Sequence, residues 1–189
     1  MNDKEIFEAA SSGDSEAFAV LYEKYAPILY RYVKRLTEHS SLTEDIVHDV
    51  FLKCVMSRKE IYREDFSAAI YLCVAARHLL YRVISELKPE CNLQEYLENT
   101  PMIFVSEPEK YFKKIETQQM IEKIMRDLPF LQKEAIILFE LEGFNLAEVA
   151  IMTKSDVGTV KSRLKRARDH LKRAAQSLQE VHPSAATPV

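Results

Sequence analysis

Only three glycines occur in the 189 residues of this chain, Gly13, Gly143 and Gly158, and they lie far apart. Loops that cradle phosphates and turns that bind dinucleotides need clustered glycines, because only glycine lets the backbone approach a phosphate closely. β-Sandwiches and β-barrels need a turn roughly every 8–12 residues, and few hairpin dipeptides occur here. The sequence therefore predicts an all-α protein and disfavours a nucleotide-dependent enzyme.

The N-terminal segment has apolar residues at helical spacing and is expected to be a helical bundle. We expect Gly13 to end a short first helix, and Asp14 or Ser15 to cap a second one. Pro27 is expected to kink this second helix or to begin its second half, because an interior proline removes a backbone donor. Thr43 is expected to cap a third helix.

The middle of the chain changes character three times. Residues 57–65 are highly charged and are predicted to form a loop. Residues 66–87 are almost continuously apolar with basic side chains among them, which predicts a buried helix with a polar stripe. Residues 88–110 contain prolines and acidic side chains without clear periodicity, which predicts an extended acidic linker between two helical domains. The expected divisions are domain 1–87, linker 88–110, domain 111–178 and a disordered tail 179–189.

The C-terminal half has the pattern of a helix-turn-helix. Helices are expected at 115–125 and 131–141. Asn145 with Glu148 three residues later is typical of a capping box, which would begin a short helix. A tight turn at 153–155 then leads to a long helix. A short helix, a tight turn and a longer helix together predict a helix-turn-helix.

The net charge of −3 conceals a strongly basic segment. Residues 153–175 hold eight basic and two acidic side chains, a net +6, so the rest of the chain carries −9. Val160 and Leu164 lie on one helical face, which directs the basic side chains outward, either as a solvated surface or as a DNA-binding one. In a helix-turn-helix, the second helix reaches base edges while flanking cations hold phosphates. The candidate DNA-binding residues are Thr159, Lys161, Ser162, Arg163, Lys165, Arg166 and Arg168.

Longer motifs carry a family resemblance. The runs LEGFNLAEVA at 141–150 and GTVKSRLKRAR at 158–168 closely resemble domain 4 of the extracytoplasmic-function (ECF) sigma factors of the sigma-70 family. The runs AFAVLYEKYAPILYRY at 17–32 and TEDIVHDVFL at 43–52 resemble domain 2 of the same family. The resemblance implies a protein that binds core RNA polymerase and directs it to promoter DNA. Domain 4 would read the −35 element, and domain 2 would melt and hold the −10 element.

The resemblance also implies protein partners. Domain 2 would grip the clamp helices of the polymerase through an exposed helix face, for which an ordinary solvated face is the competing interpretation. An anti-sigma factor that covers both domains is expected. The linker would thread through the polymerase or would serve as a plain tether. The implied polymerase-binding residues are Asp45, His48, Asp49 and Leu52.

The helix expected to read the −10 element departs from the family pattern. His78 stands where asparagine is usual, and Arg82 stands where aspartate is usual. Aromatic rings and cations that can stack on and neutralise an unpaired strand are still present. Core packing is the competing interpretation of Tyr71 and Tyr81, and His78 could equally be a core histidine. The candidate −10 residues are Arg58, Lys59, Arg63, Tyr71, Arg77, His78, Tyr81 and Arg82.

A second departure lies in the turn of the helix-turn-helix. Lys154 stands where the family often has glycine. Glycine supplies an unusual backbone conformation there, so Lys154 predicts a different turn or some backbone strain.

No pattern of catalytic or metal-binding residues appears in the sequence. The five histidines are scattered and no nucleophile–base pair is evident, so we expect neither an enzyme nor a bound metal or cofactor. Cys54, Cys73 and Cys91 form no CxxC pair, which favours a reducing cytoplasm, with the first two as core residues. No uninterrupted apolar run approaches the length of a bilayer span, so no membrane insertion is expected. The alternative function is a stand-alone helix-turn-helix regulator with an N-terminal sensing or dimerisation domain.

Overall fold

A computed structural model describes residues 2–56, 67–102, 104 and 116–181. Every regular element in these ranges is a helix, which confirms the expected all-α fold. The predicted loop at 57–65 and the predicted disordered tail lie outside the described residues, apart from the end of the last helix.

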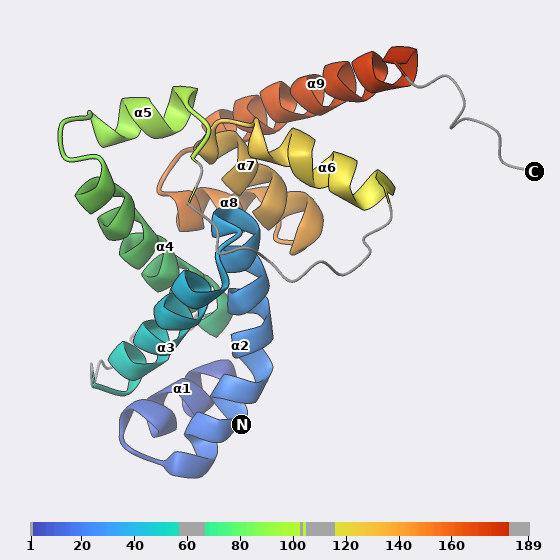
Figure 1. Ribbon diagram of the computed structural model, residues 1–189. Coiled ribbons are helices and arrows are strands. Elements are labelled where there is room, and N and C mark those ends of the chain that lie inside the picture. Colours follow the sequence, from blue (N-terminus) through green and yellow to red (C-terminus); the bar gives the residue numbers. More distant parts are fainter. Residues whose placement is uncertain (1, 57–66, 103, 105–115, 182–189) are drawn as a thin grey trace, which may run out of the picture.

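The N-terminal bundle consists of α1 (Asp3–Ser11), α2 (Ser15–Thr37), α3 (Ser40–Met56) and α4 (Ala68–Leu87), shown in Figure 1. The side chain of Asp14 caps α2 by accepting hydrogen bonds from the backbone N–H groups of Glu16 and Ala17, as expected. Gly13 has φ +100°, a conformation that favours glycine, in the turn after α1. Helix α2 continues through Pro27 to Thr37 as one element.

The expected cap at Thr43 is wrong. Helix α3 begins three residues earlier, at Ser40, and Thr43 lies inside it with its side chain fully buried. The Thr43 hydroxyl donates to the backbone carbonyl of His39 at 2.7 Å, as threonine often does one turn back along a helix. His39 replaces it at the helix start, because its Nδ1 accepts a hydrogen bond from the backbone N–H of Leu42 at 3.1 Å.

Helix α4 joins the N-terminal bundle to the C-terminal half. It is long and apolar enough by length and composition to cross a bilayer, alone among the helices of the described ranges. Core helices of globular proteins meet the same criteria, and α4 packs against α2, α3 and α8. It also buries the guanidinium of Arg77, which is ion-paired to Glu134. These contacts identify α4 as a buried core helix, as the sequence predicts.

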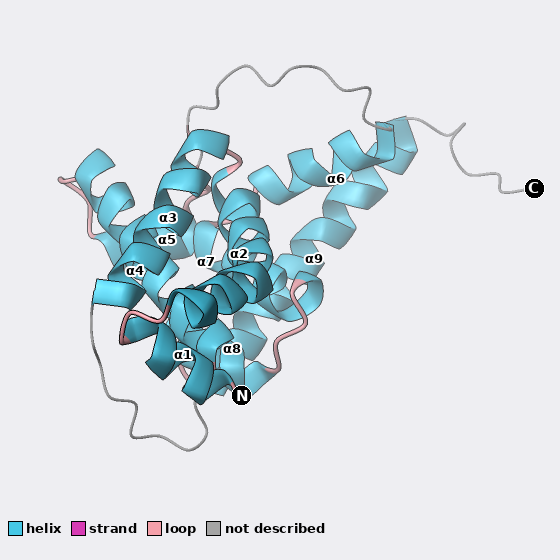
Figure 2. Ribbon diagram, turned by 90° about the horizontal axis from the view of Figure 1, so that it is seen from below, coloured by secondary structure: helices cyan, strands magenta, loops and turns pink. Residues whose placement is uncertain are grey.

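The C-terminal half comprises α6 (Glu116–Arg126), α7 (Phe130–Ile136), a π-helical turn η1 (Ile137–Leu141), α8 (Leu146–Thr153) and α9 (Val157–Val181). Helices α6 and α9 lie side by side in both views (Figures 1 and 2). Asn145 and Glu148 form the predicted capping box at the start of α8. Lys154 has φ +51° in the turn between α8 and α9, a left-handed conformation that costs a non-glycine residue about 1–2 kcal/mol. The predicted helix-turn-helix and its unusual turn are both present.

The segment predicted as an extended linker contains a helix. Helix α5 (Leu93–Asn99) is capped by Asn92, whose side chain accepts from the Glu95 N–H at 3.3 Å. Leu97 on this helix is 1% exposed, and α5 packs against α7. Its apolar residues Leu93, Tyr96 and Leu97 have helical spacing. Seven residues are nevertheless too few for this spacing to stand out, because a periodic signal needs a window of about 11–18 residues.

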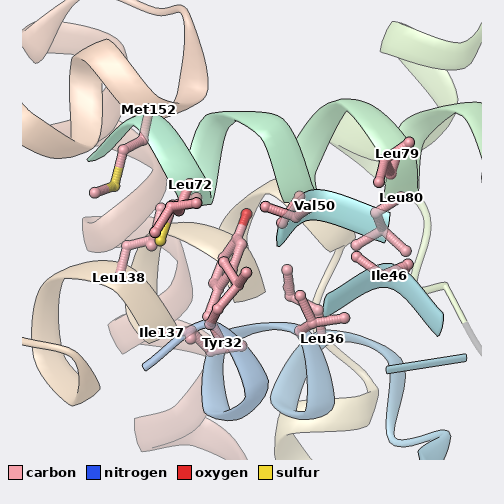
Figure 3. Close-up of a cluster of buried hydrophobic side chains, with 14 of the residues drawn as sticks. Tyr32, Leu36, Ile46, Val50, Leu72, Leu79, Leu80, Ile137, Leu138 and Met152 are labelled. Carbon is pink, nitrogen blue, oxygen red and sulfur yellow. The ribbon is translucent and has the colours of Figure 1, made fainter. Parts of the chain in front are cut away.

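A single hydrophobic core joins the N-terminal and C-terminal halves. Figure 3 shows side chains from both halves in this core, among them Tyr32 of α2, Leu72 of α4, Leu138 of η1 and Met152 of α8. All four are nearly inaccessible to solvent. The two predicted domains are therefore packed together, with α2 and α4 against α7, η1 and α8.

Candidate nucleic-acid interface

The start of α9 is fixed by Asp156. Its carboxylate accepts a hydrogen bond from the Thr159 N–H at 2.8 Å and another from the Thr159 hydroxyl at 2.6 Å. These bonds hold the pKa of the Asp156 carboxyl below its ordinary value. A Cβ at Gly158 would lie 2.9 Å from the carboxylate, so glycine leaves room for this cap. Thr159, a predicted DNA-binding residue, is thus engaged within the protein as part of a helix cap.

The exposed face of α9 is basic. Its opposite face buries Val160, Leu164 and Ala167. The predicted DNA-binding residues that lie exposed on α9 are Lys161, Ser162, Lys165, Arg166 and Arg168. Polar and cationic side chains near the start of a helix are positioned as the second helix of a helix-turn-helix requires.

Arg163 requires a correction, because its side chain does not reach this exposed face. Its side chain is 6% exposed, and its guanidinium donates to Oε2 of Glu98, from Nη2 at 3.0 Å and from Nε at 3.2 Å. Nη1 donates to the Ser155 hydroxyl at 3.3 Å. The Glu98 carboxylate of α5 thus pairs with Arg163, a residue that the sequence pattern assigns to DNA binding.

Two other arginines of α9 also have acidic partners within the chain. Arg166 is half-exposed and donates from Nη2 to Oε1 of Glu98 at 3.3 Å. Arg168 donates from Nε to Oε1 of Glu140 at 2.9 Å, an exposed pair that water screens. Lys161 and Lys165 have no ion-pair partner among the described residues. Within this conformation, the lysines are the more available cations.

Helix α4, the helix predicted to read the −10 element, buries part of its predicted DNA-binding surface. Arg77 is 7% exposed and donates from Nε to Oε1 of Glu134 on α7 at 2.9 Å. Burial alone would lower the pKa of Arg77, but the Glu134 carboxylate outweighs burial and raises it. Arg77 is therefore a buried partner of the C-terminal half in this structure, which corrects its predicted exposure to a DNA strand.

Tyr81 belongs to the same buried group. The centroid of its ring lies 4.0 Å from the Arg77 guanidinium carbon. Its hydroxyl accepts a hydrogen bond from Nη2 of Arg77 and donates one to Oε2 of Glu134 at 3.5 Å. Tyr32 of α2 donates to Oε1 of Glu134 at 2.9 Å. Burial, reinforced by the Glu134 charge, raises the pKa of both tyrosines. The core-packing interpretation describes Tyr81 in this conformation.

The remaining −10 candidates are dispersed. The ring of Tyr71 is half-buried and packs edge-on against Phe7, with centroids 4.9 Å apart. His78 and Arg82 are exposed, and Arg82 lies 3.9 Å from Glu86. His78 is therefore not a core histidine. Burial, with the nearby Lys154 and Arg77 charges, lowers the pKa of His78. Arg58, Lys59 and Arg63 lie outside the described residues.

The predicted polymerase-binding face is accessible. Its members on α3 are Asp45, His48 and Leu52, which are exposed, and Asp49, which is half-buried. Leu52 is 49% exposed. The exposed Tyr22 of α2 packs on Phe51, which precedes Leu52 in the sequence, with ring centroids 4.8 Å apart. An acidic face with apolar side chains beside it is suited to a protein partner.

Two further acidic residues hold the halves together. Glu142, whose side chain is 1% exposed, pairs with Arg31 at 3.0 Å and with Arg35. Glu38 accepts from Lys133 Nζ at 2.8 Å and from Arg126. Sequence reasoning missed Glu134, Glu142 and Glu98. For Glu134, the sequence held one usable signal. Arg77 lies in the polar stripe of the buried helix predicted at 66–87, and a buried cation requires a nearby anion.

The cysteines carry no reactive chemistry in the core. Cys54 and Cys73 are buried, as expected, and burial raises the pKa of each thiol to about 12. Neither thiol is ionised near neutral pH, so neither is a ready nucleophile or metal ligand.

Two family models match the chain. Residues 21–88 match Sigma-70 region 2, and residues 118–171 match the Sigma-70 region 4 model. The ECF RNA polymerase sigma-E factor of Haemophilus influenzae is 30% identical over 189 residues, covering 94% of this chain and 97% of that protein. The RNA polymerase sigma-H factor of Pseudomonas aeruginosa is 25% identical, covering 93% of this chain and 95% of that protein.

Solved structures share the fold. The sigma factor RpoE of Bartonella quintana, in complex with the anti-sigma factor NepR, has a TM-score of 0.59 and 24% identity, covering 79% of this chain and 91% of that chain. CnrH, in complex with the cytosolic domain of CnrY, has a TM-score of 0.62 and 16% identity, covering 93% and 97%.

Proposed function

Because this chain belongs to the ECF group of sigma-70-family RNA polymerase sigma factors, we propose that α9 reads the −35 element of its promoters. The observation that carries this proposal is the exposed basic face at the start of α9, in a helix-turn-helix. Lys161, Ser162, Lys165 and Arg166 would contact bases and the adjoining phosphates. The buried Arg163 joins them once its bond to Glu98 is released.

The N-terminal bundle would serve the −10 element and core polymerase. The exposed Asp45, His48 and Leu52, with Asp49, support a protein-binding role for α3. Of the −10 candidates, His78 and Arg82 are already exposed on α4. Arg77 and Tyr81 would face DNA only after the two halves separate, because Glu134 now occupies them. Binding to polymerase is therefore coupled to opening of the chain.

The proposed division into domains follows these roles. Residues 1–87 bind core polymerase and the −10 element, residues 111–178 bind the −35 element, and 88–110 connect them. The matches at 21–88 and 118–171 support this division. Helix α5 makes the connection partly helical and not uniformly extended.

The protein would act in the cytoplasm as a regulatory subunit. Sigma factors are non-enzymatic, and their chemistry is that of the polymerase they direct. Both solved relatives described above are bound to an anti-sigma factor or to a cytosolic partner domain, which supports an anti-sigma partner for this chain as well.

Transcription with purified bacterial core polymerase on a library of random DNA fragments tests the proposal. We expect transcripts that depend on this protein, and sequencing of their templates is expected to show two shared elements upstream of the start sites. Binding of duplex DNA by the protein alone, without initiation by core, would support the stand-alone regulator instead.

A further inference from the structure

We propose that Glu98 of α5 competes with promoter DNA for Arg163 and Arg166, so that α5 must leave α9 before the −35 element is fully bound. This regulation rests on the proposed role of α9 as the DNA-reading helix. It assigns to the linker helix a function that a tether lacks, namely restraint of DNA binding by the free chain.

The geometry of the contact carries the inference. Both oxygens of one carboxylate are used: Oε2 accepts twice from Arg163, at 3.0 and 3.2 Å, and Oε1 accepts from Arg166 at 3.3 Å. The same guanidinium donors are the ones that would bind a phosphate group of DNA. Carboxylate and phosphate therefore cannot occupy these donors together.

The contact removes Arg163 from solvent. Its side chain is 6% exposed, whereas that of Glu98 is 25% exposed. A phosphate can reach the Arg163 guanidinium only if Glu98 moves, because the third donor nitrogen is held by Ser155 at 3.3 Å. Displacement of Glu98 is thus a step in binding, not a consequence of it.

Helix α5 is built to be released as a unit. It has seven residues, too few to be stable as an isolated helix. Besides the bonds of Glu98 to Arg163 and Arg166, α5 is held by the buried Leu97 and by the partly buried Leu93 and Tyr96, which pack on the core. The helix also packs on α7, and the Phe130 N–H donates to the Thr100 carbonyl at 3.2 Å. Loss of these contacts is a local opening that leaves the bundle and the helix-turn-helix intact.

The effect on affinity follows from populations. If the chain binds DNA fully only with α5 released, the measured dissociation constant equals that of the released state divided by its population. The small population of the released state thus lowers the apparent affinity for DNA. A variant that cannot hold α5 on α9 regains the full affinity. We expect a gain in affinity of about tenfold, the value for a released state populated at about one part in ten.

The test measures binding of a fluorescently labelled mixed-sequence duplex of about 30 base pairs by the full-length protein at low salt, where phosphate contacts dominate. Glu98→Gln is compared with Glu95→Gln, which removes the same charge from an exposed position on the same helix with no ion pair among the described residues. We expect Glu98→Gln to bind about tenfold more tightly than Glu95→Gln. Equal affinities of the two variants would overturn the inference.

A second variant leaves the charge unchanged. Leu97→Ala weakens the attachment of α5, and we expect it to bind the duplex more tightly than the wild-type protein does. Wild-type affinity in this variant would also overturn the inference. Neither result depends on polymerase, so failure of the competition and failure of promoter-directed initiation are distinguishable: the first appears in duplex binding, the second in the transcription assay.

Discussion

The Glu134 carboxylate on α7 accepts a hydrogen bond from Nε of Arg77 on α4 at 2.9 Å, and both side chains are almost completely buried. This pair joins the helix proposed to read the −10 element to the domain proposed to read the −35 element. Tyr32 and Tyr81 complete the group around the same carboxylate. This polar cluster holds the two halves together, and the proposed opening on promoter DNA would have to break it.

Glu134→Ala should strongly destabilise the closed chain. The substitution leaves the Arg77 guanidinium buried without its anion, a loss of about 3–5 kcal/mol in the free energy of unfolding. Urea denaturation measures this change. Glu140→Ala is the matched control, because its pair with Arg168 is exposed and is worth at most about 1 kcal/mol. Equal effects of the two substitutions would contradict a structural role for the buried pair.

Arg166→Ala should weaken −35 binding and relax base preference. Loss of a bidentate contact to a guanine costs about 1–3 kcal/mol in binding free energy. Competition binding with duplexes that differ at single −35 positions measures both effects. Lys172→Ala, exposed farther along α9, is expected to leave base preference unchanged. Uniform weakening of Arg166→Ala on all duplexes would reduce Arg166 to a phosphate contact.

Asp49→Arg should abolish association with core polymerase without unfolding the chain. The substitution reverses the charge at the centre of the α3 face, and like charges across an interface are strongly unfavourable. Co-purification with core polymerase measures the loss, and circular dichroism verifies the fold. Glu23→Arg, at an exposed position of α2, is expected to retain association. Retained association of Asp49→Arg would show that this face lies outside the interface.

Asp3 should contribute stability that acid removes. Burial alone would raise the pKa of its carboxyl, but hydrogen bonds from Lys24 and Tyr25 outweigh burial and hold the pKa below its ordinary value of 3.8. A lowered pKa in the folded state means that the contribution is complete above the unfolded value and is lost as pH falls through the folded value. Asp3→Asn should therefore flatten the dependence of unfolding free energy on pH below about 5. If Asp3→Asn and the wild-type protein show the same pH dependence of the unfolding free energy, the stabilising role of the Asp3 carboxylate is contradicted.

Local sequence signals predict most of the helices. Ion pairs between residues far apart in the chain explain why some predicted DNA-binding side chains are buried instead. The capping box at Asn145 and the turn at Lys154 were readable from sequence because each is decided within a few residues. Arg77 and Arg163 are buried, and their acidic partners lie 57 and 65 residues away in the chain, so no local periodicity indicates either pair. Motif position could therefore make α9 the candidate DNA-reading helix without revealing that Glu98 covers Arg163 and contacts Arg166.

Run-off transcription from a single promoter selected from the random library measures whether this protein gives core polymerase its promoter preference. We expect a transcript only when both core and this protein are present, and we expect the transcript to be lost when either upstream element is scrambled. An equal transcript yield from intact and scrambled templates, or none with any template, would contradict this role.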